Sequence, residues 1–410
     1  MLSWANQFSI FCFLDNHNYN LLPHSVECIL AVSVKRDFST EPGSALSDLQ
    51  KFIDEKKSWL FGHLGYDLKN EMENLRSSHE DYLHFPATYF FEPEIIIRLT
   101  EKELIVECDG DCELIFQQLM AAGTEPVSPV SYAPLNLQQR VSKKEYLETI
   151  NKLKSHILRG DCYEINYCQE FFAEAATIDP VKVYSKLSVI SPNPFSALYK
   201  LEDKFLICAS PERFLKKQGN KILSQPIKGT SSRFLQDENK DAESRNNLFA
   251  SGKDRSENVM VVDLVRNDLS RVCEEGSVKV DELYGIYSFP QVYQMISTVS
   301  GELKKNISFE EIIKATFPMG SMTGAPKKSV MELIDRYEKS RRGIFSGALG
   351  YITPTGDFDF NVVIRSIMYN GSEHYLSFMA GSGITFYSDA EQEYEECLLK
   401  AEAMKKALTT

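Results

Sequence analysis

The order of strand-like and helix-like segments limits the possible folds of this chain more than any other feature. From residue 164 onward, short apolar or alternating segments typical of strands come in runs, and the predicted helices separate these runs. A parallel sheet needs a helical crossover between neighbouring strands and would give strict strand–helix alternation. That alternation is absent, so the pattern predicts an α+β fold with large antiparallel sheets.

Turn signals divide the chain into two parts joined by a connector. Residues 1–123 mix short apolar runs with polar turns and contain a predicted hairpin over residues 95–106. Residues 124–139 carry three prolines among Ser, Tyr and Ala, a composition typical of a linker. Residues 140–410 form the second part.

Apolar periodicity and cap residues give the elements of the second part. Ser142 and Glu145 fit a capping box, and Gly160 ends the helix that they open. Further helices are predicted over residues 181–189, 307–316, 326–339 and 389–408, with two more over 241–273 separated near Gly252. Strands are predicted over residues 164–172, 197–199, 205–209, 221–227, 291–300, 346–353, 360–369 and 375–379.

Composition and charge exclude several classes of partner. The chain has 410 residues and a formal net charge of −13. An acidic chain lacks the basic surface that binds nucleic acid or an anionic membrane, so we expect neither as a partner. The nine cysteines are scattered and odd in number, which favours a reducing cytoplasm. No segment is long enough to span a bilayer, and the apolar stretch 8–14 is too short for a signal peptide.

Lys228 is the most informative single residue for chemistry. An apolar, strand-like segment leads up to it, Pro226 stiffens the chain before it, and Gly229 follows at once. If the amine is desolvated at this position, its pKa falls and it becomes a nucleophile at neutral pH. The alternative is an ordinary surface lysine at the end of a strand.

Two pairs of carboxylates could form a metal site. Asp254 and Glu257 are three residues apart in one predicted helix, and Glu393 and Glu396 are three apart in the last helix, so each pair shares a helix face. Oxygen ligands of this kind suit Mg²⁺. The alternative is a solvated acidic face, in which Lys400 forms an ordinary ion pair with Glu396 one turn earlier.

Four further features could contribute to a site. The glycine-rich segments 320–327 and 380–384 could bind an anion through free N–H groups, or could simply pack tightly at turns. Arg365 lies in an apolar predicted strand and needs a carboxylate partner, from the protein or from a substrate. Glu212, between two predicted strands, could act as a general acid or base or could pair with an arginine. After residue 160 the only histidine is His374, so we expect no Ser–His or Cys–His nucleophile in that part of the chain.

Seven short segments of this chain, in the same order, resemble segments of the chorismate-utilising enzymes. That family includes the large subunits of anthranilate synthase and aminodeoxychorismate synthase, and the isochorismate and salicylate synthases. The resemblance covers residues 140–408 and implies two large antiparallel sheets packed together with helices outside. It implies that residues 1–123 are an N-terminal region of the anthranilate synthase component I type and that residues 140–410 are a chorismate-binding catalytic domain. The matching segments are residues 160–163, 210–212, 226–230, 263–269, 320–327, 356–359 and 381–383.

Two positions indicate a branch of the family. Lys228 stands in Pro-Ile-Lys-Gly-Thr, the form that the resemblance associates with aminodeoxychorismate synthases, whereas anthranilate synthases usually carry alanine there. Glu164 stands where isochorismate and salicylate synthases carry a water-activating lysine. The resemblance therefore implies the synthesis of 4-amino-4-deoxychorismate from chorismate and ammonia. Anthranilate synthase and a non-catalytic chorismate-binding protein are the alternatives.

The resemblance also implies a role for each candidate residue. Lys228 would attack C2 of chorismate, and Glu212 would be the general acid for the C4 hydroxyl. Arg365 would bind the enolpyruvyl carboxylate, and Lys400 would add positive charge. Mg²⁺ would be held mainly by Glu257 and Glu396, with Asp254 and Glu393 acting directly or through water. The pocket would be lined by Gly229, Thr230, Ser321, Gly381, Ser382 and Gly383.

Three departures and two absences complete the comparison with the family pattern. Gln294 stands where a histidine is usual, and Phe345 where a substrate-binding tyrosine is common. Asp254 stands at the first metal-pair position, where anthranilate synthases carry glutamate. We identify no glutaminase nucleophile elbow, so ammonia should come from a separate glutamine amidotransferase subunit or from free ammonium. The chain has no room for a pyridoxal-dependent lyase domain, so a separate enzyme should release p-aminobenzoate for folate synthesis.

Overall fold

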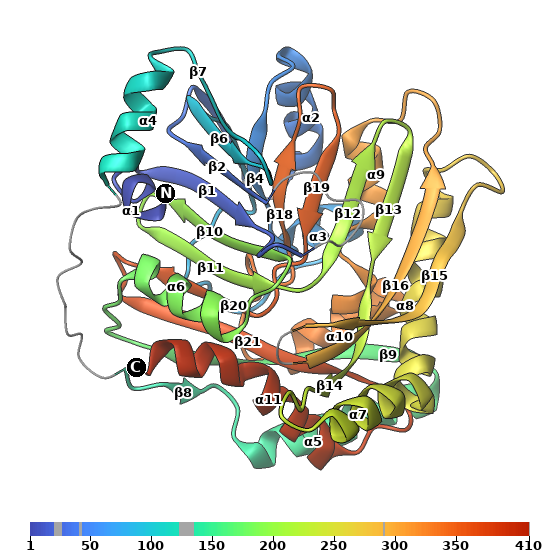
Figure 1. Cartoon of the computed structure of the whole chain (residues 1–410). Coiled ribbons are helices and arrows are strands. Elements are labelled where there is room, and N and C mark those ends of the chain that lie inside the picture. The colour runs from blue at the N-terminus through green and yellow to red at the C-terminus, as the bar shows by residue number, and fades with distance from the viewer. Residues whose placement is uncertain (20–26, 41–42, 123–134, 290–291, 410) are drawn as a thin grey trace.

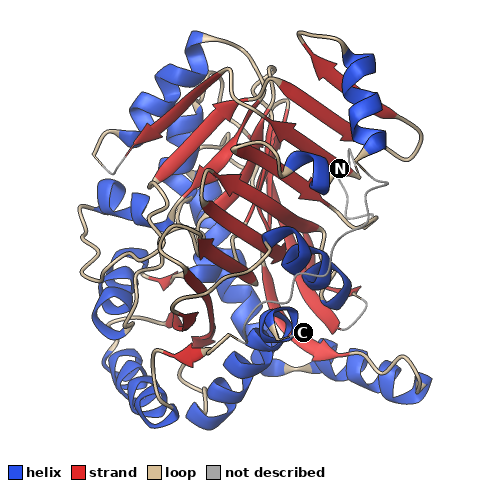
Figure 2. Ribbon diagram, turned by 90° about the vertical axis from the view of Figure 1, so that its left-hand side faces the viewer, coloured by secondary structure: helices blue, strands red, loops and turns tan. Residues whose placement is uncertain are grey.

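Two large antiparallel sheets pack against each other, and helices cover their outer sides (Figures 1 and 2). The computed structural model describes residues 1–19, 27–40, 43–122, 135–289 and 292–409. This architecture confirms the predicted α+β fold. No helix in these ranges is both long enough and apolar enough to cross a membrane.

The first sheet has eleven strands among the described residues, and both ends of the chain contribute to it. Strand β9 is buried along its whole length, since β21 pairs with it and helices cover its outer face. In spatial order the strands are β17 (Gly324–Ala325), β9 (Glu164–Ala173), β21 (Tyr375–Ile384), β20 (Ser366–Asn370), β11 (Lys204–Ser210), β10 (Phe195–Leu201), β1 (Ile10–Asp15), β2 (Cys28–Val32), β6 (Ile95–Leu99) and β7 (Leu104–Cys108), with β8 (Gln138–Gln139) beside β9.

The second sheet has ten strands within the same described ranges, and it also mixes early and late segments. Strand β4 pairs with β18, so residues far apart in sequence are neighbours. In spatial order the strands are β14 (Ile227–Ser232), β16 (Val292–Glu302), β13 (Lys221–Gln225), β12 (Arg213–Gln218), β19 (Phe358–Asn361), β18 (Ala348–Ile352), β4 (Leu60–Leu64), β5 (Thr88–Glu92) and β3 (Arg36–Thr40), with β15 (Lys279–Ser288) beside β16.

The helices begin and end close to their predicted limits in the second part of the chain. Ser142 and Glu145 form the predicted capping box, and Gly160 ends the helix with φ +83°. The helices are α1 (Leu2–Ala5), α2 (Ala45–Glu55), α3 (Lys69–Glu73), α4 (Cys112–Ala121), α5 (Lys143–Arg159), α6 (Pro180–Ile190), α7 (Glu238–Ala250), α8 (Gly252–Ser270), α9 (Phe309–Thr316), α10 (Lys327–Tyr337) and α11 (Ala390–Leu408), with short 3₁₀ turns η1 (Tyr66–Leu68) and η2 (Gly320–Met322).

The first sheet is buried on both faces. Along β1, Cys12 belongs to the core between the two sheets, whereas Phe11 and Phe13 belong to the core beneath the helices. This alternation follows from the two-residue period of a strand. Helix α11 packs on β21 and α6, so the outer core includes Cys397 and Ala401.

Two strand predictions and one turn prediction need correction. The predicted strand over residues 360–369 is wrong, because the chain leaves the second sheet after β19, turns at residues 362–365 and enters the first sheet as β20. The segment 380–384 is not a turn but the end of β21. The predicted strand over residues 221–227 splits at Pro226, which cannot donate a ladder hydrogen bond, into β13 and β14.

The predicted hairpin over residues 95–106 is confirmed as β6 and β7. The predicted connector, residues 124–139, lies mostly outside the described residues, and its end forms β8. All nine cysteines lie within the described ranges and are free thiols.

Candidate active site

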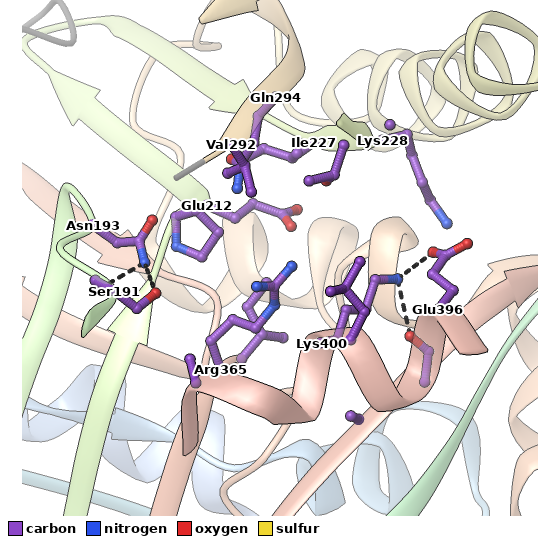
Figure 3. A pocket seen from close by; sticks show the side chains of 18 of the residues that line it. Ser191, Asn193, Glu212, Ile227, Lys228, Val292, Gln294, Arg365, Glu396 and Lys400 are labelled. Atoms are coloured by element: carbon purple, nitrogen blue, oxygen red, sulfur yellow. Dashed lines mark hydrogen bonds and ion pairs between the residues drawn. The ribbon is translucent and has the colours of Figure 1, made fainter. Parts of the chain in front are cut away.

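A cavity of about 470 Å³ opens beside helices α8 and α11, between the ends of the two sheets (Figure 3). Its volume suits a small organic ligand. Twelve of the fourteen predicted site residues line it, whereas the Ser382 and Glu393 positions do not. The twelve are Glu212, Lys228, Gly229, Thr230, Asp254, Glu257, Ser321, Arg365, Gly381, Gly383, Glu396 and Lys400.

Lys228 points from β14 across the cavity toward the first sheet. Its Nζ donates a 2.6 Å hydrogen bond to Oε1 of Glu164, the first residue of β9. The expectation of a lowered pKa is wrong for this state of the protein. Burial does lower the pKa of the Lys228 amine, but the charges of Glu164 and Glu257 outweigh burial and hold that pKa above its ordinary value.

Two positions next to the Lys228–Glu164 ion pair or to Lys228 itself require or favour glycine. At Gly383 an added Cβ would lie 2.6 Å from Lys228 Nζ and 2.8 Å from Glu164 Oε1, so only glycine allows the ion pair to rest on β21. Gly229 has φ +94°, which strongly favours glycine, and a Cβ there would lie 3.0 Å from Cβ of Asp254.

Glu212 is a buried carboxyl that accepts hydrogen bonds from Ser321 and from the backbone of Ile227. Ser321 Oγ donates to Glu212 Oε1 at 2.6 Å. Burial raises the pKa of Glu212 to about 7. The alternative role, pairing with an arginine, does not apply to the neighbouring Arg213, which forms its ion pair with Asp359. Glu212 is therefore suited to hold a proton at neutral pH.

Arg365 lies in the crossing between the two sheets, with a left-handed backbone at φ +52°. Its guanidinium points into the cavity (Figure 3), and within the described residues it has no hydrogen bond or ion pair. Burial lowers the pKa of this group, although the charge of Glu396 partly opposes the change. A guanidinium that is sheltered from water and unpaired favours an anionic ligand.

Helices α8 and α11 bring the two acidic pairs to one end of the cavity. Lys253 lies between them, with its Nζ 3.0 Å from Glu393 Oε1 and 3.8 Å from Glu257 Oε1. Burial raises the pKa of Glu257 to about 7. Burial also opposes ionisation of Glu396, but Lys400 outweighs it and lowers the pKa of Glu396 to about 2. The Lys400 ammonium lies 2.7 Å from Glu396 and also donates to the Gly381 carbonyl at 3.0 Å, as Figure 3 shows.

The oxygen atoms of these carboxylates fit the chemistry of a divalent cation. Glu257 Oε1 and Glu393 Oε2 are buried and accept no hydrogen bond. In the described part of the chain, no three His, Cys, Asp or Glu side chains are grouped closely enough to hold a metal as they stand. A cation would therefore compete with the Lys253 ammonium for these oxygens.

Comparison with known proteins places the chain in a family. Residues 13–406 match the family described as chorismate binding enzyme. The chain belongs to this family. The match includes the N-terminal strands and so extends beyond residues 140–408, where the sequence motifs lie.

Relatives and solved structures agree with the family assignment. The chain is 31% identical to "Aminodeoxychorismate synthase component 1" of Escherichia coli, over 93% of this chain and 86% of that protein. It is 34% identical to "Anthranilate synthase component I-like protein" of Synechocystis, over 85% and 72% of the two chains. The crystal structure of anthranilate synthase component I from Streptococcus pneumoniae superposes with a TM-score of 0.80 at 26% identity, over 94% of each chain. The chain is thus a chorismate-utilising enzyme.

All three departures from the family pattern lie in the same cavity. It is lined by Gln294 on β16, by Phe345 and by Asp254. Gln294 is buried, and its Oε1 accepts no hydrogen bond. The sequence had assigned no role to Glu164, although a charged residue at the start of a fully buried strand is a usable signal.

Proposed function

We propose that this chorismate-binding enzyme is component I of an aminodeoxychorismate synthase, which converts chorismate and ammonia to 4-amino-4-deoxychorismate. The observation that carries the proposal is the position of Lys228, whose amine reaches into the cavity from the Pro-Ile-Lys-Gly-Thr segment. Four bacterial relatives at 31–38% identity have the name aminodeoxychorismate synthase component 1. Every residue that lines the cavity lies between Asn166 and Lys406, so we assign the chemistry to residues 140–410.

Substrate binding relies on charge complementarity. Chorismate carries two carboxylates, and the unpaired Arg365 guanidinium is the natural partner for the enolpyruvyl carboxylate. Lys400 adds a second positive charge on the same side of the cavity (Figure 3). Gly381 and Gly383 of β21 form part of the wall of the same cavity.

Magnesium is the cofactor that the acidic helices favour. Glu257 and Glu396 would be its main ligands, with Asp254 and Glu393 acting directly or through water. When bound, the ion supplies positive charge that neutralises and orients the ring carboxylate. Lys253, which now neutralises Glu257 and Glu393, would have to move aside.

Lys228 and Glu212 would carry the covalent chemistry. The Lys228 nitrogen attacks C2, the ring double bonds shift, and the C4–O bond breaks. Glu212 donates its proton to the departing hydroxyl, which leaves as water. A pKa of about 7 suits this role, because the carboxyl still holds its proton near neutral pH. Ammonia then attacks C4, the C2–N bond breaks, and the proton released from the new amine returns to Glu212.

The remaining partners follow from this reaction. Ammonia would come from a separate glutamine amidotransferase subunit, component II, or from free ammonium. A separate lyase would release p-aminobenzoate from the product, for folate synthesis. We place the enzyme in the cytoplasm, in keeping with its nine free thiols.

One assay distinguishes the proposed function from its alternatives. The purified chain is mixed with chorismate, Mg²⁺ and ammonium chloride, and the products are separated by liquid chromatography with and without added aminodeoxychorismate lyase. We expect 4-amino-4-deoxychorismate, converted to p-aminobenzoate only when the lyase is present. Fluorescent anthranilate formed without the lyase would assign the chain to anthranilate synthase. The absence of any product would indicate a non-catalytic chorismate-binding protein.

The Lys228→Ala and Glu212→Ala variants serve as controls in the same assay. Both should lose product formation while retaining the fold, measured by circular dichroism. Full activity of Lys228→Ala would exclude a covalent route through the lysine.

A further inference from the structure

The contact between Lys228 and Glu164 joins the two sheets at the cavity. Lys228 belongs to β14, at the edge of the second sheet, and Glu164 begins β9 in the first sheet. Their side chains are 10% and 1% exposed, so little water screens the 2.6 Å contact. Gly383 of β21 lies directly beneath both charged groups.

Glu164 retains one free oxygen. Its Oε1 accepts the hydrogen bond from Lys228, whereas its Oε2 is buried and has no hydrogen-bond partner. A buried carboxylate oxygen without a donor is costly. Oε2 is therefore open to a further partner while Oε1 stays in contact with the amine.

Other carboxylates face Lys228 from the elements around it, but they do not touch it. Glu257 on α8 and Glu396 on α11 raise the pKa of the amine through space, and Glu212 also interacts with it electrostatically. Among the described residues, only Glu164 forms an ion pair or hydrogen bond with the Lys228 amine. Glu212 already has a different task in the proposed reaction, because it must carry a proton to the leaving hydroxyl.

The amine needs a proton acceptor, because an ammonium has no lone pair and cannot attack carbon. Resting on the proposed function, we infer that Glu164 is a further catalytic residue, the general base that takes the proton from the Lys228 ammonium and returns it at the end of the cycle. The direct contact makes this transfer possible without a water molecule or a change of side-chain position.

Protons and bonds balance over the cycle. The proton moves from Lys228 Nζ to Glu164, and the neutral amine forms the C2–N bond while water leaves C4 with the proton of Glu212. Ammonia then forms the C4–N bond, and the C2–N electron pair returns to the lysine nitrogen. The ammonium formed at C4 gives one proton to Glu212, and Glu164 returns its proton to Lys228. The net change is chorismate plus ammonia to 4-amino-4-deoxychorismate plus water.

The Glu164→Gln variant in the full chain tests this inference. Glutamine keeps the size of the side chain and can still accept a hydrogen bond, but it cannot take the proton at neutral pH. We expect kcat with saturating ammonium to fall by about 10²-fold or more, while the KM for chorismate changes by less than about threefold. Glu170→Gln is the matched control. Glu170 lies on the same strand and is buried, but it pairs with Arg140 and Tyr375 away from the cavity.

The pH profile separates a proton acceptor from a merely structural residue. The wild-type rate at each pH is the reference, because the supply of free ammonia changes with pH for both enzymes alike, and in the wild type the proton stays within the Lys228–Glu164 pair. In Glu164→Gln the proton must leave to solvent, so its rate relative to wild type should rise about tenfold per pH unit between about pH 5.5 and 7. In Glu164→Ala, added formate should restore part of the activity, because it can occupy the space of the missing carboxylate.

Two results would overturn the inference. One is a Glu164→Gln enzyme with kcat and pH profile close to wild type, which would mean that desolvation alone keeps the amine neutral. The other is a parallel loss of chorismate binding and folding in every Glu164 variant, without formate rescue, which would make the residue structural. A wild-type chain that forms anthranilate would instead refute the proposed function, and the two failures are therefore distinguishable.

Discussion

Replacing Glu212 by glutamine should stabilise the protein while it abolishes activity. Glu212 has a pKa of about 7 in the folded protein, against 4.5 for an ordinary glutamate. Between these values the folded state holds more protons than the unfolded state, so stability falls as pH rises from about 4.5 to about 7. The difference corresponds to about 3 kcal/mol of lost stability at pH 8.5, at about 1.4 kcal/mol per pKa unit.

Glutamine removes this cost, because it is neutral at every pH and can still accept the hydrogen bond from Ser321. For a chain of 410 residues, about 3 kcal/mol is equivalent to a melting temperature about 4 °C higher. Differential scanning fluorimetry of Glu212→Gln and wild type, without ligand, at pH 4.5 and 8.5 measures the effect. We expect a difference at pH 8.5 and almost none at pH 4.5. Equal melting temperatures at both pH values would refute a raised pKa for Glu212.

Three further variants test other parts of the cavity. Arg365→Ala should raise the KM for chorismate by about 30-fold or more. The melting temperature should not fall, because the guanidinium has no protein partner to lose. An unchanged KM would contradict the role of Arg365 in binding chorismate. Gly383→Ala should lower kcat by about tenfold or more, because the added Cβ would displace the Lys228 amine. Normal turnover would show that the Lys228–Glu164 ion pair is dispensable. Glu257→Gln should raise the Mg²⁺ concentration needed for half-maximal activity by about tenfold or more, and an unaltered Mg²⁺ titration would remove Glu257 from the ligand set.

Local signals predicted the elements that depend on local chemistry. The capping box at Ser142 and the glycine at 160 fixed both ends of α5, because caps satisfy backbone groups within a few residues. Amphipathic periodicity placed α11 within one residue of its observed start. These features do not require knowledge of any distant contact.

The sequence failed where a distant contact decides the structure. The apolar run over residues 360–369 looks like one strand, but its two halves, on either side of Arg365, pair with different sheets, and pairing partners are not visible in a local pattern. The pKa of Lys228 was predicted in the wrong direction for the same reason. Burial was foreseen, whereas the approach of Glu164, 64 positions earlier in the chain, depends on how the two sheets meet.

The pairing of β9 with β21 has a consequence for synthesis on the ribosome. β9 is fully buried in the finished sheet and carries apolar side chains such as Ile165, Phe171 and Phe172, yet β21 begins about 200 residues later. At cellular elongation rates β9 waits roughly 10 to 40 s for its neighbour. During that interval a nascent chain exposes these apolar side chains together with an unpaired strand edge, which makes it a natural client for chaperones and favours slow, cool expression.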